Sequence, residues 1–111
     1  MPELPEVESL VRALRETSLI GKTLSSVHLI CPKIPTHVQT LAGRRLLDIR
    51  RRGKYLYFSF SGAKHLIVHL RMTGQFVLKT VGEIAARHER VLFHFEDNLT
   101  LAFHDTRRFV H

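Results

Sequence analysis

Residues 44–60, Arg-Arg-Leu-Leu-Asp-Ile-Arg-Arg-Arg-Gly-Lys-Tyr-Leu-Tyr-Phe-Ser-Phe, decide the fold that we expect for this chain. The end of the stretch alternates, so that Leu56, Phe58 and Phe60 share one face of a β-strand. Gly53 lies before this run, where a tight turn favours a residue that tolerates a positive φ. The stretch therefore predicts a β-hairpin. Its expected strands are Arg44–Arg52 and Tyr55–Phe60.

The same two-residue period recurs after and before this hairpin. Leu66, Val68 and Leu70 alternate with His65, Ile67, His69 and Arg71, which predicts a strand with one buried face and one face that carries polar groups. Asp97-Asn98 is typical of a two-residue hairpin turn. A loop with one short helical turn is expected over Cys31–Gly43, because this segment carries two prolines. The other expected strands are Leu24–Ile30, Gln75–Lys79, Val91–Glu96 and Leu99–Phe103.

The N-terminal segment has the period of a helix instead. From Pro5 to about Thr17, four apolar side chains follow the i, i+3, i+4, i+7 spacing of one buried stripe, and Gly21 is the expected stop. One helix and about seven short strands predict a mainly β, α+β fold. We expect a two-layer β-sandwich or small barrel with the helix against it. The four apolar residues are Val7, Leu10, Val11 and Leu14.

The composition indicates one globular domain with excess positive charge. The 111 residues are 44% hydrophobic and 24% charged, which excludes a disordered tail. Seventeen Lys and Arg against ten Asp and Glu give +7, and residues 44–111 hold all of the excess. No apolar run approaches the ~20 residues that a membrane-spanning helix needs. Cys31 is the single cysteine, which excludes an internal disulfide and a zinc site built from cysteines. We expect a cytoplasmic, nucleoid-associated protein. Its expected partner is a polyanion, and nucleic acid is favoured over an acidic membrane surface.

The first residues, Met-Pro-Glu-Leu-Pro-Glu, offer a nucleophile. Removal of Met1 would expose the secondary amine of Pro2, and an α-amino group titrates near pH ~8 whereas lysine titrates near ~10.4. Such an amine can attack an aldehyde-level carbon to give an iminium ion, and Glu3 and Glu6 could donate a proton and stabilise charge. The alternative is structural, since prolines and glutamates also begin and cap helices. These residues alone favour the structural alternative.

A second candidate group consists of Lys54, His69 and Arg71, which suit phosphate contacts. The run from 44 to 54 has six basic residues against one acidic residue, and Tyr55 and Tyr57 follow it. This density favours a polyanion-binding surface over a merely solvated basic face. His69 taken alone is better explained as an ordinary half-buried histidine.

A third group could form a wedge between bases, with a guanidinium reaching a base edge. The alternative is that its apolar members are core residues and its arginines are surface residues, and spacing does not choose between them. Its members are Met72, Arg107, Arg108 and Phe109. The other histidines show no metal-ligand spacing, so we interpret them as structural or surface groups. They are His28, His37, His65, His88, His94, His104 and His111.

Four motifs taken together resemble the N-terminal domain of the formamidopyrimidine-DNA glycosylase family. They follow one another in the family's order and span nearly the whole chain. Leu4 indicates the formamidopyrimidine branch, because the endonuclease VIII branch typically has glycine there. The motifs are Met-Pro-Glu-Leu-Pro-Glu-Val-Glu at 1–8, Arg-Arg-Gly-Lys-Tyr-Leu at 51–56, His-Leu-Arg-Met-Thr-Gly-Gln at 69–75 and Asp-Thr-Arg-Arg-Phe at 105–109.

The resemblance implies a bifunctional repair enzyme that removes oxidised purines, such as 8-oxoguanine and formamidopyrimidine, and then nicks the strand by β,δ-elimination. It implies that Pro2 attacks C1′ and forms the Schiff base, that Glu3 acts as general acid/base and that Glu6 supports the site. The resemblance places Lys54 among the catalytic residues. It also implies that Lys54 and His69 bind the phosphates that flank the lesion.

The resemblance also assigns the remaining DNA contacts. Met72, Arg107 and Phe109 would fill the void left by the everted base, with Arg107 facing the orphaned cytosine, because a flipped nucleotide loses its stacking. Arg108 would contact the backbone, and Arg71 belongs to the same DNA-binding group.

The chain also departs from the family pattern. Thr106 and Val110 stand where proline and glycine are usual, so the loop around Arg107 could differ in shape. The family's helix-two-turn-helix domain and its zinc finger, which usually holds one structural zinc, lie outside residues 1–111, so we expect no cofactor here. We expect residues 1–111 alone to bind damaged double-stranded DNA weakly and in a salt-sensitive way, and to excise little of the lesion. We expect the full-length protein to be a monomer. The rival interpretations are a non-catalytic DNA-binding module and a ribosomal-type RNA-binding β-protein.

Overall fold

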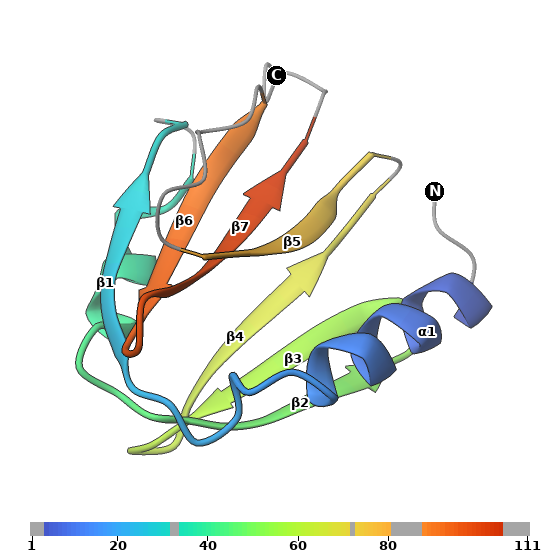
Figure 1. Cartoon of the computed structure of the whole chain (residues 1–111). Coiled ribbons are helices and arrows are strands. Elements are labelled where there is room, and N and C mark those ends of the chain that lie inside the picture. The colour runs from blue at the N-terminus through green and yellow to red at the C-terminus, as the bar shows by residue number, and fades with distance from the viewer. Residues whose placement is uncertain (1–3, 32–33, 72, 81–87, 106–111) are drawn as a thin grey trace.

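The computed structural model describes residues 4–31, 34–71, 73–80 and 88–105, which form one helix, a short 3-10 helix and seven strands (Figure 1). The prediction for Tyr55–Phe60 is confirmed residue for residue, and the other predicted strands agree with the structure to within two residues at each end. The elements are α1 (Leu4–Arg15), β1 (Leu24–Leu29), η1 (Thr36–Leu41), β2 (Leu46–Arg52), β3 (Tyr55–Phe60), β4 (Lys64–His69), β5 (Gln75–Thr80), β6 (Glu89–Phe95) and β7 (Leu99–His104).

The strands form two antiparallel sheets. One sheet has the order β1-β6-β7-β5 and the other has the order β2-β3-β4. Figure 1 shows the two sheets as two layers, with α1 beside the β2 and β3 strands. The expected mainly β sandwich with a flanking helix is therefore confirmed.

Phenylalanine rings join the two layers. Phe58 of β3 lies 5.4 Å from Phe76 of β5, which lies 5.3 Å from Phe103 of β7, measured between ring centroids. The first of these rings is 1% exposed. Burying a side chain of this size contributes about 1.5–3 kcal/mol, so the alternation of β3 supplies much of what holds the layers together.

The helix packs its predicted stripe but ends earlier than predicted. Val7, Val11 and Leu14 are buried, and the helix ends at Arg15 because the Thr17 hydroxyl donates to the Leu14 carbonyl oxygen at 2.6 Å. The expectation that Gly21 ends the helix was wrong. Gly21, with φ +97°, lies in the following turn, and its N–H donates to the Leu46 carbonyl oxygen at 2.8 Å.

The predicted buried face of β4 is only half-buried at two of its three positions. Leu70 is buried, but Leu66 and Val68 are intermediate. Both line a cavity of about 550 Å³ between β4, η1 and the four-stranded sheet. Strand alternation predicted which way these side chains point but not how well the opposite layer covers them.

Candidate nucleic-acid interface

The β2–β3 turn presents one of the predicted phosphate contacts. Gly53 has φ +59° and occupies the first position of this two-residue turn, where a side chain would be strained. Lys54 is the second residue, and its side chain is half-buried. The glycine thus lets β2 reverse directly into β3 and places the lysine at the tip of the hairpin.

His69 lies next to this turn on the neighbouring strand. Tyr55, the residue after Lys54, pairs with His69 across β3 and β4, and their ring centroids are 4.9 Å apart. The Arg71 backbone N–H donates to His69 Nδ1 at 3.1 Å. Because Nδ1 is the acceptor, a neutral His69 carries its proton on Nε2, which can donate to an anion. Lys54 thus precedes the residue that pairs with His69, so the two lie in neighbouring parts of the sheet end.

Arg51 ties the start of α1 to the same turn. Its Nε donates to Glu8 Oε2 at 3.1 Å, and its Nη1 donates to the Gly53 carbonyl oxygen at 3.0 Å. Glu6, an exposed residue in the first turn of α1, is thereby held at the end of the molecule that carries Lys54. Figure 1 shows the start of α1 and the β2–β3 turn together at the right-hand side.

The segment after β4 is a tight connection. Arg71 is exposed and has φ +58°, and the Gly74 N–H donates to the Leu70 carbonyl oxygen at 2.8 Å. A Cβ on Gly74 would come within 2.5 Å of that oxygen, so only glycine fits. This geometry holds Arg71 on the same side of the sheet end as His69.

A hydrogen bond links this connection to the end of β7. The Thr73 hydroxyl donates to Asp105 Oδ1, and Asp105 is 2% exposed. The Asp105 N–H donates to the His88 carbonyl oxygen at 3.1 Å. Thr73 directly follows Met72 in the chain, and Asp105 lies two residues before Arg107. The two segments that carry the predicted wedge residues are therefore fastened to each other next to those residues.

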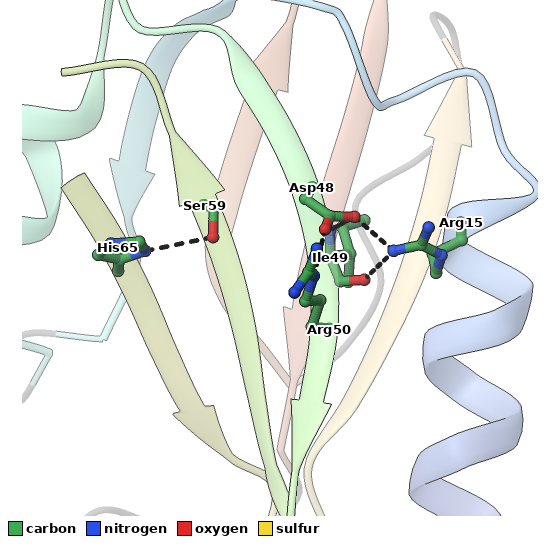
Figure 2. Close-up of polar contacts among 6 residues, drawn as sticks. All are labelled: Arg15, Asp48, Ile49, Arg50, Ser59 and His65. Carbon is green, nitrogen blue, oxygen red and sulfur yellow. Dashed lines mark hydrogen bonds and ion pairs between the residues drawn. The ribbon is translucent and has the colours of Figure 1, made fainter. Parts of the chain in front are cut away.

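Part of the basic run is neutralised within the fold. Asp48 forms ion pairs with Arg15 and Arg50, and Arg15 also donates to the Ile49 carbonyl oxygen at 2.7 Å (Figure 2). Burial alone would raise the pKa of the Asp48 carboxyl, but hydrogen bonds from Arg50, the Ile49 N–H and Arg15 outweigh it and hold that pKa below its usual range. The positive field of residues 44–54 is thus weaker than the sequence count suggests.

Six of the predicted site residues lie outside the described part of the chain, so their predicted roles stay predictions. They are Pro2, Glu3, Met72, Arg107, Arg108 and Phe109. Within the described residues, no three His, Cys, Asp or Glu side chains come together to hold a metal ion. No helix in the described ranges has the length and apolarity to cross a membrane.

Sequence reasoning missed three features of this interface. The Tyr55 ring against His69 follows from the strand register, and the Arg51 contacts depend on how α1 docks. The bond between Thr73 and Asp105 joins residues 32 apart. Only the first had a signal in the sequence, since Tyr55 adjoins the predicted turn.

Comparison with known proteins extends these observations. A family model described as the formamidopyrimidine-DNA glycosylase N-terminal domain matches residues 1–111. The formamidopyrimidine-DNA glycosylase of Protochlamydia amoebophila is 44% identical over 98% of this chain and 42% of its own length. That of Lactiplantibacillus plantarum is 40% identical over 98% of this chain and 41% of its own length. The chain spans about two fifths of the length of these relatives.

Solved structures agree with the sequence relatives. The chain superposes with a TM-score of 0.88 on Lactococcus lactis Fpg in complex with FAPY-dG-containing DNA, with 33% identity over 96% of this chain and 42% of that one. A second complex of the Lactococcus lactis protein, with DNA containing an abasic site, gives a TM-score of 0.89 and 33% identity over 97% of this chain and 41% of that one.

Proposed function

Because the chain belongs to the formamidopyrimidine-DNA glycosylase N-terminal domain family, we propose that it carries the reacting amine and the strand grip of an enzyme that excises oxidised purines from DNA. The observation that carries this proposal is the family match over all of residues 1–111. The solved neighbours bound to FAPY-dG-containing and abasic DNA support a damaged-DNA partner. The rest of such an enzyme, its lesion pocket included, would come from outside these residues.

Lys54 and His69 would grip the phosphates that flank the lesion. The ammonium group of Lys54 supplies a point charge, and the Nε2–H of His69 supplies a directed hydrogen bond, because its Nδ1 already accepts from the Arg71 backbone. Arg71 is exposed one position beyond the buried Leu70 and adds a second charge on the same side. Together they would fix the damaged strand at the hairpin tip.

The chemistry would begin at the Pro2 nitrogen. Its lone pair attacks C1′ of the damaged nucleotide, the bond from C1′ to the base breaks, and the base leaves with a proton. Opening of the sugar leaves an iminium ion between Pro2 and C1′. Loss of a C2′ proton then expels the 3′ phosphate, and a second elimination expels the 5′ phosphate. Glu3 would move protons at the sugar, and Glu6 would support the hydrogen bonds around it.

Met72, Arg107 and Phe109 would occupy the space left by the everted base, and Arg108 would bind the backbone. The Thr73–Asp105 hydrogen bond supports this proposal, since it fastens the chain next to both segments that carry these residues. We propose that the full-length protein is a monomer in the cytoplasm, associated with the nucleoid.

Borohydride trapping on an abasic-site duplex tests this function. Borohydride reduces the iminium ion to a stable amine, so the expected product is a covalent adduct of the chain, without Met1, attached to DNA through Pro2. A matched protein with one residue retained ahead of Pro2 should bind the duplex and give no adduct. Binding of the abasic duplex without an adduct, by protein whose intact mass shows a free Pro2, would favour a non-catalytic DNA-binding module. Equal affinity for undamaged RNA would favour an RNA-binding β-protein.

A further inference from the structure

The outer face of the three-stranded sheet is rich in exposed aromatic and basic side chains. Since Leu56, Phe58 and Phe60 point into the core, the alternate residues of β3 point outward. The strand register aligns them in rows across the sheet. We call this surface the tyrosine face. Its rows are Arg52–Tyr55–His69, Arg50–Tyr57–Ile67 and Asp48–Ser59–His65.

This face carries exposed apolar surface. Tyr55 is 49% exposed and Ile67 is 52% exposed, and they lie in adjacent rows. A scattered apolar residue on a surface is ordinary, but Tyr55 and Ile67 flank a second ring, Tyr57, and the three side chains form a patch. Such a patch on a chain with a net charge of +7 suits a partner that is both flat and anionic.

Charged and hydrogen-bonding groups border the rings. Arg50 and Arg52 flank the tyrosines on the β2 side, and both are exposed. The third row is already paired within the protein: Ser59 Oγ lies 3.2 Å from His65 Nδ1, and Asp48 binds Arg15 and Arg50 (Figure 2). Arg50 shares this pairing with Asp48, so the exposed Arg52 and the two tyrosine rings are the groups that a ligand can contact.

The spacing of the rings indicates unpaired bases rather than a duplex. Residues two apart on a strand are about 6.8 Å apart, which is twice the ~3.4 Å step between stacked bases. Two bases that lie on Tyr55 and Tyr57 would be unstacked from each other, as in an extended single strand. Aromatic rings interleaved with Arg on an open sheet are the usual platform for such strands.

We propose that the tyrosine face binds an unpaired nucleic-acid strand, with bases stacked on Tyr55 and Tyr57 and a phosphate on Arg52. The proposal extends the proposed function, because Tyr55 adjoins Lys54 in the chain and contacts His69, so the face continues the proposed grip on the damaged strand. It requires the nucleic-acid partner of that function but none of its covalent chemistry.

The chain provides its own reporter for this test. It has two tyrosines and no tryptophan, so its intrinsic fluorescence comes entirely from the tyrosine face. Titration of the chain with a short oligothymidylate at low salt should quench this fluorescence saturably, with the same dissociation constant that the anisotropy of a labelled oligonucleotide gives. Binding by anisotropy with unchanged tyrosine fluorescence, or no binding at all, would overturn the proposal.

Substitutions separate stacking from charge. Tyr57→Ala and Tyr55→Ala should each weaken oligothymidylate binding about five-fold or more, whereas Tyr57→Phe and Tyr55→Phe, which keep the ring, should bind as the parent does. Val77→Ala, an exposed residue of the other sheet, is the matched control and should change nothing. Circular dichroism confirms folding, and alanine variants that fold and still bind fully would refute stacking. Borohydride trapping on the unsubstituted chain is an independent readout, so failure of the proposed function and failure of this face are distinguished.

Discussion

Replacing Thr73 by valine should destabilise the chain by much more than the loss of one surface hydroxyl. Thr73 donates to Asp105 Oδ1, and Asp105 is 2% exposed. A hydrogen bond to a charged group is worth about 1.5–3 kcal/mol, and the variant removes this donor from a carboxylate that stays buried. For a chain of 111 residues, a loss of about 2 kcal/mol lowers the Tm by about 8 °C.

Urea unfolding at neutral pH measures this loss directly. Thr40→Val is the matched control, because the Thr40 hydroxyl is exposed and donates only to the His37 carbonyl oxygen. Its expected cost is within about 0.5 kcal/mol. A double-mutant cycle with Asp105→Asn should give a coupling free energy of at least about 0.5 kcal/mol, since the residues are in contact. If Thr73→Val costs no more than Thr40→Val, the two segments are not fastened at this point and the reasoning fails.

Three further predictions concern charge. Asp48→Asn should cost about 1 kcal/mol at neutral pH. Because the pKa of Asp48 is lowered in the folded state, the difference from the parent in urea unfolding should begin to shrink only as the pH falls below about 4 and should disappear below that lowered pKa. A difference that stays constant with pH would contradict this. Burial, with a smaller effect from His28, lowers the pKa of His94, so protonation favours the unfolded chain and stability should fall as the pH drops below about 6.5. His94→Gln should flatten that fall in thermal unfolding, whereas the exposed His37→Gln should not. Lys54→Ala should weaken binding to abasic duplex and lower the slope of log affinity against log salt by about 1, measured by anisotropy; an unchanged slope would remove Lys54 from the phosphate grip.

The sequence predicted the elements whose signals are local. The alternation at Leu56, Phe58 and Phe60 is set by strand geometry alone, and the β6–β7 turn at Asp97-Asn98 has φ values of 63° and 61°, as such a two-residue turn requires. The end of α1 depends on which group the Thr17 hydroxyl contacts, and the cover over Leu66 and Val68 depends on the opposite layer. The first is a local contact that the apolar spacing of the helix does not reveal, and the second depends on residues far along the chain.

The candidate site divides in the same way. Lys54 and His69 could be brought together from the sequence, because the hairpin and the register of the next strand fix their neighbourhood. Two contacts connect distant segments and depend on tertiary packing. They are the ion pair between Arg51 and Glu8 and the hydrogen bond from Thr73 to Asp105. The roles of Pro2, Glu3, Met72, Arg107, Arg108 and Phe109 stay predictions, since they fall outside the described residues.

The β6–β7 turn has a practical consequence for anyone preparing this protein. An affinity tag is commonly fused to the first residue, but here such a fusion would acylate the amine that the proposed chemistry needs. Asp97 and Asn98 are exposed, and Figure 1 shows their turn at the left of the molecule, far from the β2–β3 turn at the right. Exposed hairpin tips tolerate inserted segments. A purification epitope or a dye spliced between these two residues would leave the leading end of the polypeptide untouched.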